Sequence, residues 1–171
     1  SQRPLENTFR MGNAWLVSNI KTVKSADEEI LALSDSTLDL SETAVIQMEF
    51  GGFETVRDRD EEATIDMIHY AANAIEYRSK STSNQLAVFS EIYYPKGWNC
   101  YVDNKLTPHF RANYVLRGLQ LPQGEHKIVW KFEPETFYQA KSASLIGSSL
   151  LILVCLVVCY FALNPIGPKV G

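Results

Sequence analysis

The longest uncharged stretch of the sequence lies near its C-terminal end, at positions 142–168. Its central part, positions 143–163, reads ASLIGSSLLILVCLVVCYFAL and is apolar at most positions. About 20 residues at ~1.5 Å per residue span the ~30 Å hydrocarbon core of a bilayer. The pattern therefore predicts a transmembrane helix over residues 142–164, with a domain over residues 1–141 before it and a short tail over residues 165–171 after it.

Before this stretch, short runs of β-branched, aromatic and alternating residues are typical of β-strands. Asp103 and Asn104 fit a two-residue hairpin turn, because both tolerate positive φ, and Gly124 fits the positive-φ position of a second hairpin loop. The runs predict strands at residues 11–23 (two short strands or one bent strand), 43–50, 64–70, 74–79, 85–94, 98–102, 105–106, 113–121 and 126–133. This spacing predicts a mainly β fold, an antiparallel β-sandwich that is Ig-like or jelly-roll-like.

One short N-terminal helix is predicted within this β-rich region. Ser25 and Glu28 have the spacing of a capping box, in which the serine side chain accepts a hydrogen bond from the backbone N–H three residues on and the glutamate side chain reaches back to the start of the helix. The acidic residues 27–29 place negative charge at the positive end of the helix dipole. Apolar residues follow at positions 30, 31 and 33, so the helix should run from residue 26 to about residue 34.

Composition removes several classes of function. The chain has 16 basic and 20 acidic residues, a net charge of −4, and all the acidic residues precede the apolar stretch. A mildly acidic domain is unsuited to nucleic acid, which attracts clustered Lys and Arg, and it is no polybasic binder of membrane surfaces. Cys100 is the only cysteine before the apolar stretch, which contains Cys155 and Cys159, so the sequence predicts neither a disulfide framework nor a zinc site.

No cofactor, metal site or catalytic residue is predicted. The acidic run Asp58, Asp60, Glu61 and Glu62 lacks the glycine turn and ligand spacing of a calcium loop, so a solvated loop is the preferred interpretation. The three histidines lie on different predicted elements without metal-ligand spacing, and His69 alternates with apolar residues as a core histidine does. The sequence also lacks the nucleophile elbow, the P-loop and the dinucleotide-binding motif.

One group of residues is the candidate for ligand contact. Aromatic faces stack on sugar rings, and Arg binds phosphate or carboxylate in a fork. The candidate residues for contact with a glycan or phosphate are Glu91, Tyr93, Trp98, His109, Arg111 and Arg117. The alternative is that the aromatic residues pack the sandwich core while the arginines pair with Glu91 or Asp103; it is preferred, because aromatic residues at strand spacing are mostly core.

The same region carries a resemblance to a known family. The segments SEIYYPKGWNCYVDN (residues 90–104) and HFRANYVLRGLQLPQGEHKIVWKFEP (residues 109–134), followed by an apolar helix, resemble the C-terminal end of YfhO-family bacterial membrane proteins. The earlier segments MGNAWLV (residues 11–17) and DEEILAL (residues 27–33) are similar to that family's lead-in to this domain. The resemblance covers most of the 171 residues.

The resemblance implies that the chain is the extracytoplasmic C-terminal domain and last helix of a polytopic protein in the bacterial inner membrane. Members of the family are similar to glycosyltransferases of the cell envelope that use lipid-linked sugars. The catalytic carboxylate of such enzymes belongs to an early extracytoplasmic loop, which this sequence does not contain, so no catalytic residue carries over. The implied partners are membrane lipid, the remaining transmembrane helices and a glycan or lipid-linked sugar.

Two other functions stay open. The chain could be a single-pass subunit that uses its β-domain for interaction or assembly and its helix as anchor. Many apolar spans encoded upstream of Ser1 favour the polytopic protein, whereas a start codon with a short leader favours the single-pass subunit. A membrane-anchored hydrolase using Ser90 and His109 is the least supported, because nothing in the sequence brings these residues together.

Overall fold

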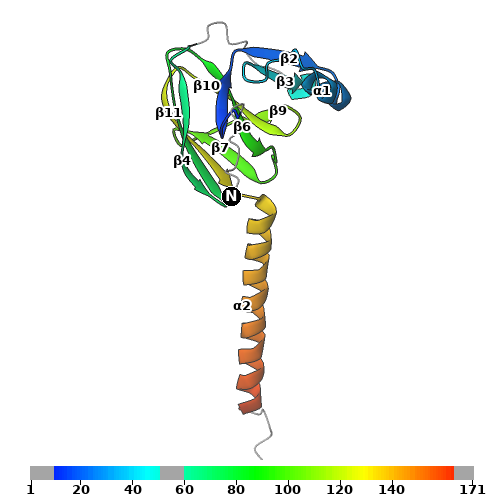
Figure 1. The fold of residues 1–171 in the computed structure, drawn as a ribbon. Helices are drawn as coiled ribbons and strands as arrows, with labels where there is room; N and C mark the ends of the chain where they lie inside the picture. The colour runs from blue at the N-terminus through cyan, green and yellow to red at the C-terminus, as the bar shows by residue number, and fades with distance from the viewer. Residues whose placement is uncertain (1–9, 51–59, 164–171) are drawn as a thin grey trace, which may run out of the picture. The chain divides into compact units, whose positions relative to one another are not determined.

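The computed structural model describes residues 10–50 and 60–163 (Figure 1). The chain divides into two compact units, Ser1–Phe132 and Glu133–Gly171. The first unit is built from strands and one short helix, and the second contains a single long helix in its described part. The fold is mainly β with antiparallel sheets, as the sequence predicts.

Within the described residues, two antiparallel sheets form the body of the first unit. The four-stranded sheet has the order β1-β6-β10-β9, formed by Ala14–Val17, Gln85–Ile92, Leu116–Leu121 and Phe110–Ala112. The five-stranded sheet has the order β4-β5-β11-β7-β8, formed by Thr64–Ala71, Ala74–Ser81, Gly124–Phe132, Trp98–Val102 and Lys105–Thr107. Val102 pairs with Lys105 across Asp103 and Asn104, whose φ values of 49° and 67° confirm the predicted two-residue turn.

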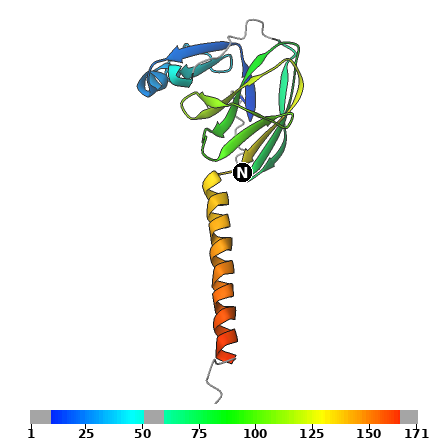
Figure 2. The ribbon, with the colours of Figure 1, turned by 180° about the vertical axis from the view of Figure 1, so that it is seen from behind.

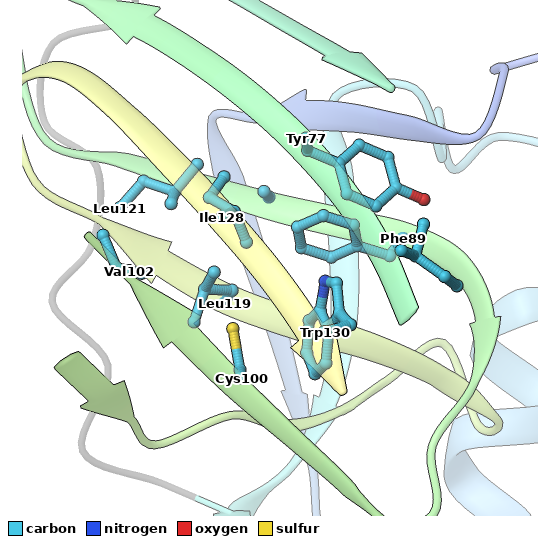
Figure 3. Packing of buried hydrophobic residues seen from close by; sticks show 10 residues of the cluster. Tyr77, Phe89, Cys100, Val102, Leu119, Leu121, Ile128 and Trp130 are labelled. Carbon is cyan, nitrogen blue, oxygen red and sulfur yellow. The ribbon is translucent and has the colours of Figure 1, made fainter. Parts of the chain in front are cut away.

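The main core lies between the two sheets. Figure 3 shows Trp130 of β11 beside Phe89 of β6, with Tyr77 of β5 on the other side of Phe89. The centroid of the Phe89 ring lies 5.2 Å from that of Trp130 and 4.9 Å from that of Tyr77. Edge-to-face aromatic pairs of this kind add about 0.5–1.5 kcal/mol each to the stabilisation from buried area. Leu119 and Ile128 fill the space between the sheets and are fully buried.

The four-stranded sheet is covered on both faces. Residues Gln85–Phe89 of β6 are all buried, because Ala87 and Phe89 face the main core while Leu86 and Val88 face a second apolar cluster. That second cluster includes Ala44 and Ile46 of β3. A strand buried on both faces reads as a continuous apolar run, which is the pattern of residues 86–89.

The second face is covered by a small β-α-β unit whose elements the sequence predicted, but whose parallel pairing it did not. Strands β2 (Asn19–Val23) and β3 (Thr43–Gln47) pair in parallel, and helix α1 (Ala26–Leu33) connects them. Figures 1 and 2 show α1 with β2 and β3 set to one side of the sandwich. The predicted capping contacts form with a shift of one residue: the Ser25 hydroxyl accepts from the Glu28 N–H, and the Glu28 carboxylate accepts from the N–H of Lys24, the residue before the N-cap. A short 3₁₀ helix, η1 (Met48–Phe50), follows β3.

The second unit contains helix α2 (Glu135–Leu163), drawn as one uninterrupted helix in Figure 2. Its segment Ala140–Tyr160 has a mean hydropathy of 2.4 and is long and apolar enough to cross a membrane. The Ser149 hydroxyl donates to the Leu145 carbonyl at 2.8 Å, so this serine satisfies its polar group on its own helix.

Two predictions made from residue alternation are wrong, and both fail at backbone irregularities. The pairing of β4 with β5 shifts between Met67 and His69, so Ile68 is an extra residue and His69 is exposed instead of buried. The strand predicted from residue 113 begins only at Leu116, because Asn113 and Tyr114 have φ values of 47° and 69°. The acidic run that begins at Asp58 lies partly outside the described residues.

Candidate functional site

Arg117 on β10 is the most deeply buried charged candidate. Arg117 is only 2% exposed, and its Nε donates to the Ile92 carbonyl at 2.9 Å. Its Nη1 is buried and has no hydrogen-bond partner among the described residues. The guanidinium carbon lies 4.3 Å from the centroid of the Trp98 ring and 5.0 Å from that of Trp130, so two indole faces hold the cation. Burial lowers the pKa of Arg117, while the charge of Glu91 acts in the opposite direction and favours the cation.

A bulge in β6 explains how this arginine reaches its partner carbonyl. Arg117 is opposite Phe89, but its neighbour Leu116 is opposite Ile92, so two extra residues, Ser90 and Glu91, are inserted into β6. A bulge bends its strand and re-aims the side chains next to it. Here it brings the Ile92 carbonyl to the Arg117 Nε.

His109 lies against the same indole as Arg117. Its ring stacks on Trp130 with centroids 5.0 Å apart and planes at 22°, and its Nε2 donates to the Trp98 carbonyl at 2.9 Å. Burial, with a smaller contribution from the Arg117 charge, lowers the pKa of His109 to about 4. The imidazole is therefore neutral at pH 7, so it offers no positive charge to a phosphate and is a weak base.

Tyr93 connects these residues to Arg111. Its ring meets His109 edge-on at 5.4 Å and Phe50 edge-on at 6.0 Å, and the Arg111 guanidinium lies over Phe50 at 5.1 Å. Trp98 continues the series at the other end, with its ring 5.4 Å from that of Phe132. The structure thus joins five of the six candidates in one chain of ring and cation contacts, and Glu91 is coupled to it through its charge near Arg117.

Arg111 is held by an ion pair across a long sequence separation. Its Nη2 donates to the Glu29 carboxylate at 2.9 Å and to the Gln47 side-chain oxygen at 2.7 Å. Glu29 is fully buried, and its second oxygen accepts from the Tyr114 N–H at 2.7 Å. The expectation that Arg111 pairs with Glu91 or Asp103 is therefore wrong. Asp103 instead bonds the His126 ring at 2.6 Å.

The groups that suggested hydrolysis are engaged in different places. The Ser90 hydroxyl donates to the Gly12 carbonyl at 2.7 Å, and the Nε2 of His109 is occupied by the Trp98 carbonyl. Cys100 is 1% exposed, and burial raises the pKa of its thiol to about 12. None of these contacts forms a nucleophile with an oriented base.

Two pockets of the first unit are lined by residues other than the six candidates. One pocket of about 680 Å³ is lined by Arg10, Trp15, Ser90 and Leu116 among others, and a second of about 310 Å³ is lined by Ser41, Asp60 and Gln85 among others. None of the six candidates lines either pocket. In residues 10–50 and 60–163, no group of three or more His, Cys, Asp or Glu side chains is placed to hold a metal ion.

Three residues of this arrangement were not singled out in the sequence. Glu29 stands among the acidic residues of a helix start, Trp130 has the alternation of a core strand, and Phe50 ends an apolar run. Glu29 and Arg111 are 82 residues apart, so no local pattern connects them. Only the second sheet face and the β-α-β unit that covers it bring them together.

A family model described as "Bacterial membrane protein YfhO" matches residues 2–144 of the chain. No curated protein and no solved structure matches it.

Proposed function

Because the chain belongs to the YfhO family of bacterial membrane proteins, we propose that it forms the C-terminal end of a polytopic, glycosyltransferase-like protein of the cell envelope. The observation that carries this proposal is the extent of the family match, which runs from residue 2 through the β-domain into the start of the apolar helix. The domain itself is non-catalytic in this proposal. It shapes or covers the extracytoplasmic face of the enzyme.

The contacts of the candidate residues support a non-catalytic domain. Arg117 and His109 are held by indole rings and backbone carbonyls, and Arg111 is held by a buried carboxylate. Each of the three side chains makes at least one of these contacts inside the domain, although Arg117 Nη1 and Arg111 Nε have no hydrogen-bond partner among the described residues, so we assign the three side chains a stabilising role. A glycan from an acceptor or from a lipid-linked donor would meet the half-buried side chains of Glu91, Tyr93 and Trp98 instead of the two guanidinium groups.

The test compares three preparations in membranes: the full protein encoded by the gene, the same protein ended before Ser1, and the 171-residue chain alone. Upstream of Ser1 we expect several apolar spans of about 18 or more residues. Sugar transfer should appear with the full protein and be absent with the 171-residue chain. Turnover by that chain alone would end the proposal.

A matched pair of variants in the full protein separates structural support from catalysis. Ser90→Ala removes one surface hydroxyl and should leave sugar transfer unchanged. Glu29→Ala should lower the amount of folded protein, while the activity per folded molecule remains. A large loss of activity in Ser90→Ala at normal protein level contradicts a non-catalytic domain.

The proposed location is the inner membrane, with the domain on the extracytoplasmic side. Fusion of a periplasm-active reporter and of a cytoplasm-active reporter after residue 132 tests this directly. Activity of only the cytoplasmic reporter would refute the sidedness.

The single-pass interaction subunit is the second candidate, because α1 exposes the apolar residues Ile30 and Leu31 at 43% and 70%. A gene that encodes only a short leader before Ser1 would favour it.

A further inference from the structure

One histidine joins two hairpin connections of the sandwich. The Nδ1 of His126 lies 2.6 Å from the Asp103 carboxylate in the β7–β8 turn, and its Nε2 lies 3.0 Å from the Gln123 carbonyl in the β10–β11 loop. The Gln123 N–H donates at 3.0 Å to the side chain of Asn84, just before β6. We call these four residues the His126 clasp. We propose that the clasp holds the β10–β11 loop while His126 is protonated and releases the loop when His126 loses a proton. This switch does not depend on sugar transfer.

Both ring nitrogens of His126 face oxygen atoms that only accept hydrogen bonds. A neutral imidazole carries one N–H and can donate to one of the two oxygens, whereas the imidazolium donates to both. The Asp103 carboxylate is the stronger acceptor, because a hydrogen bond to an ionised group is about twice as strong as a neutral one. A deprotonated His126 therefore keeps its proton on Nδ1. The lone pair of Nε2 then faces the Gln123 carbonyl oxygen at 3.0 Å, and that contact becomes repulsive.

The two sides of the clasp differ in how firmly the backbone is held. The Asp103 N–H donates to the Lys127 carbonyl, and the Asp103 Oδ1 accepts from the Lys127 N–H, both at 2.9 Å. On the other side, Gly124 directly follows Gln123 and has a φ of 120°, where only glycine is free of strain. A Cβ at Gly124 would also lie 3.1 Å from the His126 Nε2. Loss of the Nε2 bond should therefore move the β10–β11 loop and leave the β7–β8 turn in place.

The His126 clasp closes one end of the main core. His126 is two positions before the core residue Ile128 on β11, so its ring lies on the core side of the sheet, and its side chain is 17% exposed. Leu121, which is buried, ends β10 directly before the loop. Ser79 pairs with His126 across β5 and β11, and the buried Ser79 hydroxyl has no hydrogen-bond partner among the described residues. Release of the loop should let water reach this end of the core.

The charges around His126 set the direction of the pH dependence. The hydrogen bond to Asp103 raises the pKa of His126 most, followed by the Gln123 carbonyl and the Asp103 charge, against the effect of burial. Lys105 is exposed on β8, beyond the turn that contains Asp103. The other charged residues of β5 and of β11 near His126 alternate with the core-facing positions, so they lie on the opposite face of the sheet: Glu76, Arg78, Lys80, Glu125 and Lys127. The loop should therefore be held below pH 6.5 and released at a higher pH.

The experiment follows the ¹⁵N-labelled 171-residue chain by NMR in detergent micelles, while the pH is raised through 6.5 into the alkaline range. The ring signals of His126 should change from those of the imidazolium to those of the tautomer with its proton on Nδ1. The second readout is the protection of the Gln123 N–H against exchange, corrected for the intrinsic effect of pH. A change in chemical shift alone can arise from the nearby charge, whereas a loss of protection requires movement of the loop.

We expect the protection of the Gln123 N–H to fall roughly tenfold with the same midpoint as the titration of His126, the change that one hydrogen bond contributes. Asp103→Asn keeps an oxygen for the Lys127 N–H but removes the negative charge, so both midpoints should move together to lower pH. Protection that is equal on both sides of the His126 titration overturns the proposal. A change in protection that keeps its midpoint in Asp103→Asn, while the pKa of His126 falls, also overturns it.

A second variant tests the clasp without changing Asp103. His126→Gln removes the titrating ring, so the protection of the Gln123 N–H should no longer change with pH. The matched control is His69→Gln, which replaces an exposed histidine on β4 and should leave both midpoints where they are. Circular dichroism establishes that each variant is folded. A pH-dependent loss of protection that survives His126→Gln refutes the assignment of the switch to this histidine.

Discussion

Replacing Glu29 with alanine should destabilise the domain far more than any other single change of an acidic residue on α1. Glu29 is fully buried and accepts two hydrogen bonds, from the Arg111 Nη2 and from the Tyr114 N–H. Removing one partner of a buried ion pair leaves the other charge uncompensated, at a cost of about 3–5 kcal/mol. An orphaned buried N–H adds about 1–3 kcal/mol.

The structure places the expected loss near the lower end of that combined range. The Arg111 side chain is 21% exposed and keeps its bond to Gln47, so the guanidinium can gain some hydration after the carboxylate is removed. We therefore expect Glu29→Ala to lower the free energy of unfolding by about 4 kcal/mol. The control is Glu28→Ala on the exposed side of the same helix, which removes only the capping contact to Lys24 and should cost about 1 kcal/mol.

The assay is urea unfolding of the detergent-solubilised chain, followed by tryptophan fluorescence. Trp130 and Trp15 lie in or against the apolar clusters of the first unit, so their emission reports its unfolding. Replacing Glu29 and Arg111 together by methionine should restore much of the loss, because an apolar pair leaves no buried charge. If Glu29→Ala unfolds at the same urea concentration as Glu28→Ala, the ion pair does not tie α1 to the sandwich and our reasoning is wrong.

Three further predictions concern the sandwich. Gly118→Ala should lower the free energy of unfolding by about 1–3 kcal/mol, because the new Cβ would overlap the Phe110 ring that covers this glycine. If the variant unfolds at the same urea concentration as the wild type, the ring moves aside freely and the prediction is wrong. His126 should titrate above its ordinary pKa of 6.5, because Nδ1 faces the Asp103 carboxylate and Nε2 faces the Gln123 carbonyl, and Asp103→Asn should return it toward 6.5 in an NMR titration. The raised pKa of His126 contributes stability that is fully present below pH 6.5 and is lost as the pH rises through the pKa of the folded state. The lowered pKa of Asp103 contributes stability that is lost as the pH falls through the folded-state pKa of this carboxyl, which lies below 3.8. The pair should therefore stabilise the domain most between about pH 4 and 6.5. Cys100 should resist maleimide in the folded chain and react after urea is added, and rapid labelling without urea would contradict its burial.

Local sequence determined a large part of this protein. The apolar stretch specifies a helix that can cross a membrane, because length and hydropathy alone decide that property. The Ser25 cap and the Asp103-Asn104 turn formed as predicted, since each depends on residues within a few positions of one another. The aromatic and β-branched runs predicted most strands of both sheets, because these residues suit the half-buried surface of a strand, but they did not predict β9 (Phe110–Ala112).

The tertiary structure decided what alternation could not. The bulge at Ile68 exposes His69, and the bulge at Ser90 and Glu91 brings the Ile92 carbonyl to Arg117, because one or two inserted residues reverse or re-aim side chains without changing composition. The parallel pairing of β2 with β3 joins strands 24 residues apart, and the pairing of Glu29 with Arg111 joins side chains 82 residues apart. The candidate residues could be chosen from their chemistry, but only the packed sandwich decided that indole rings and a buried carboxylate occupy their charges.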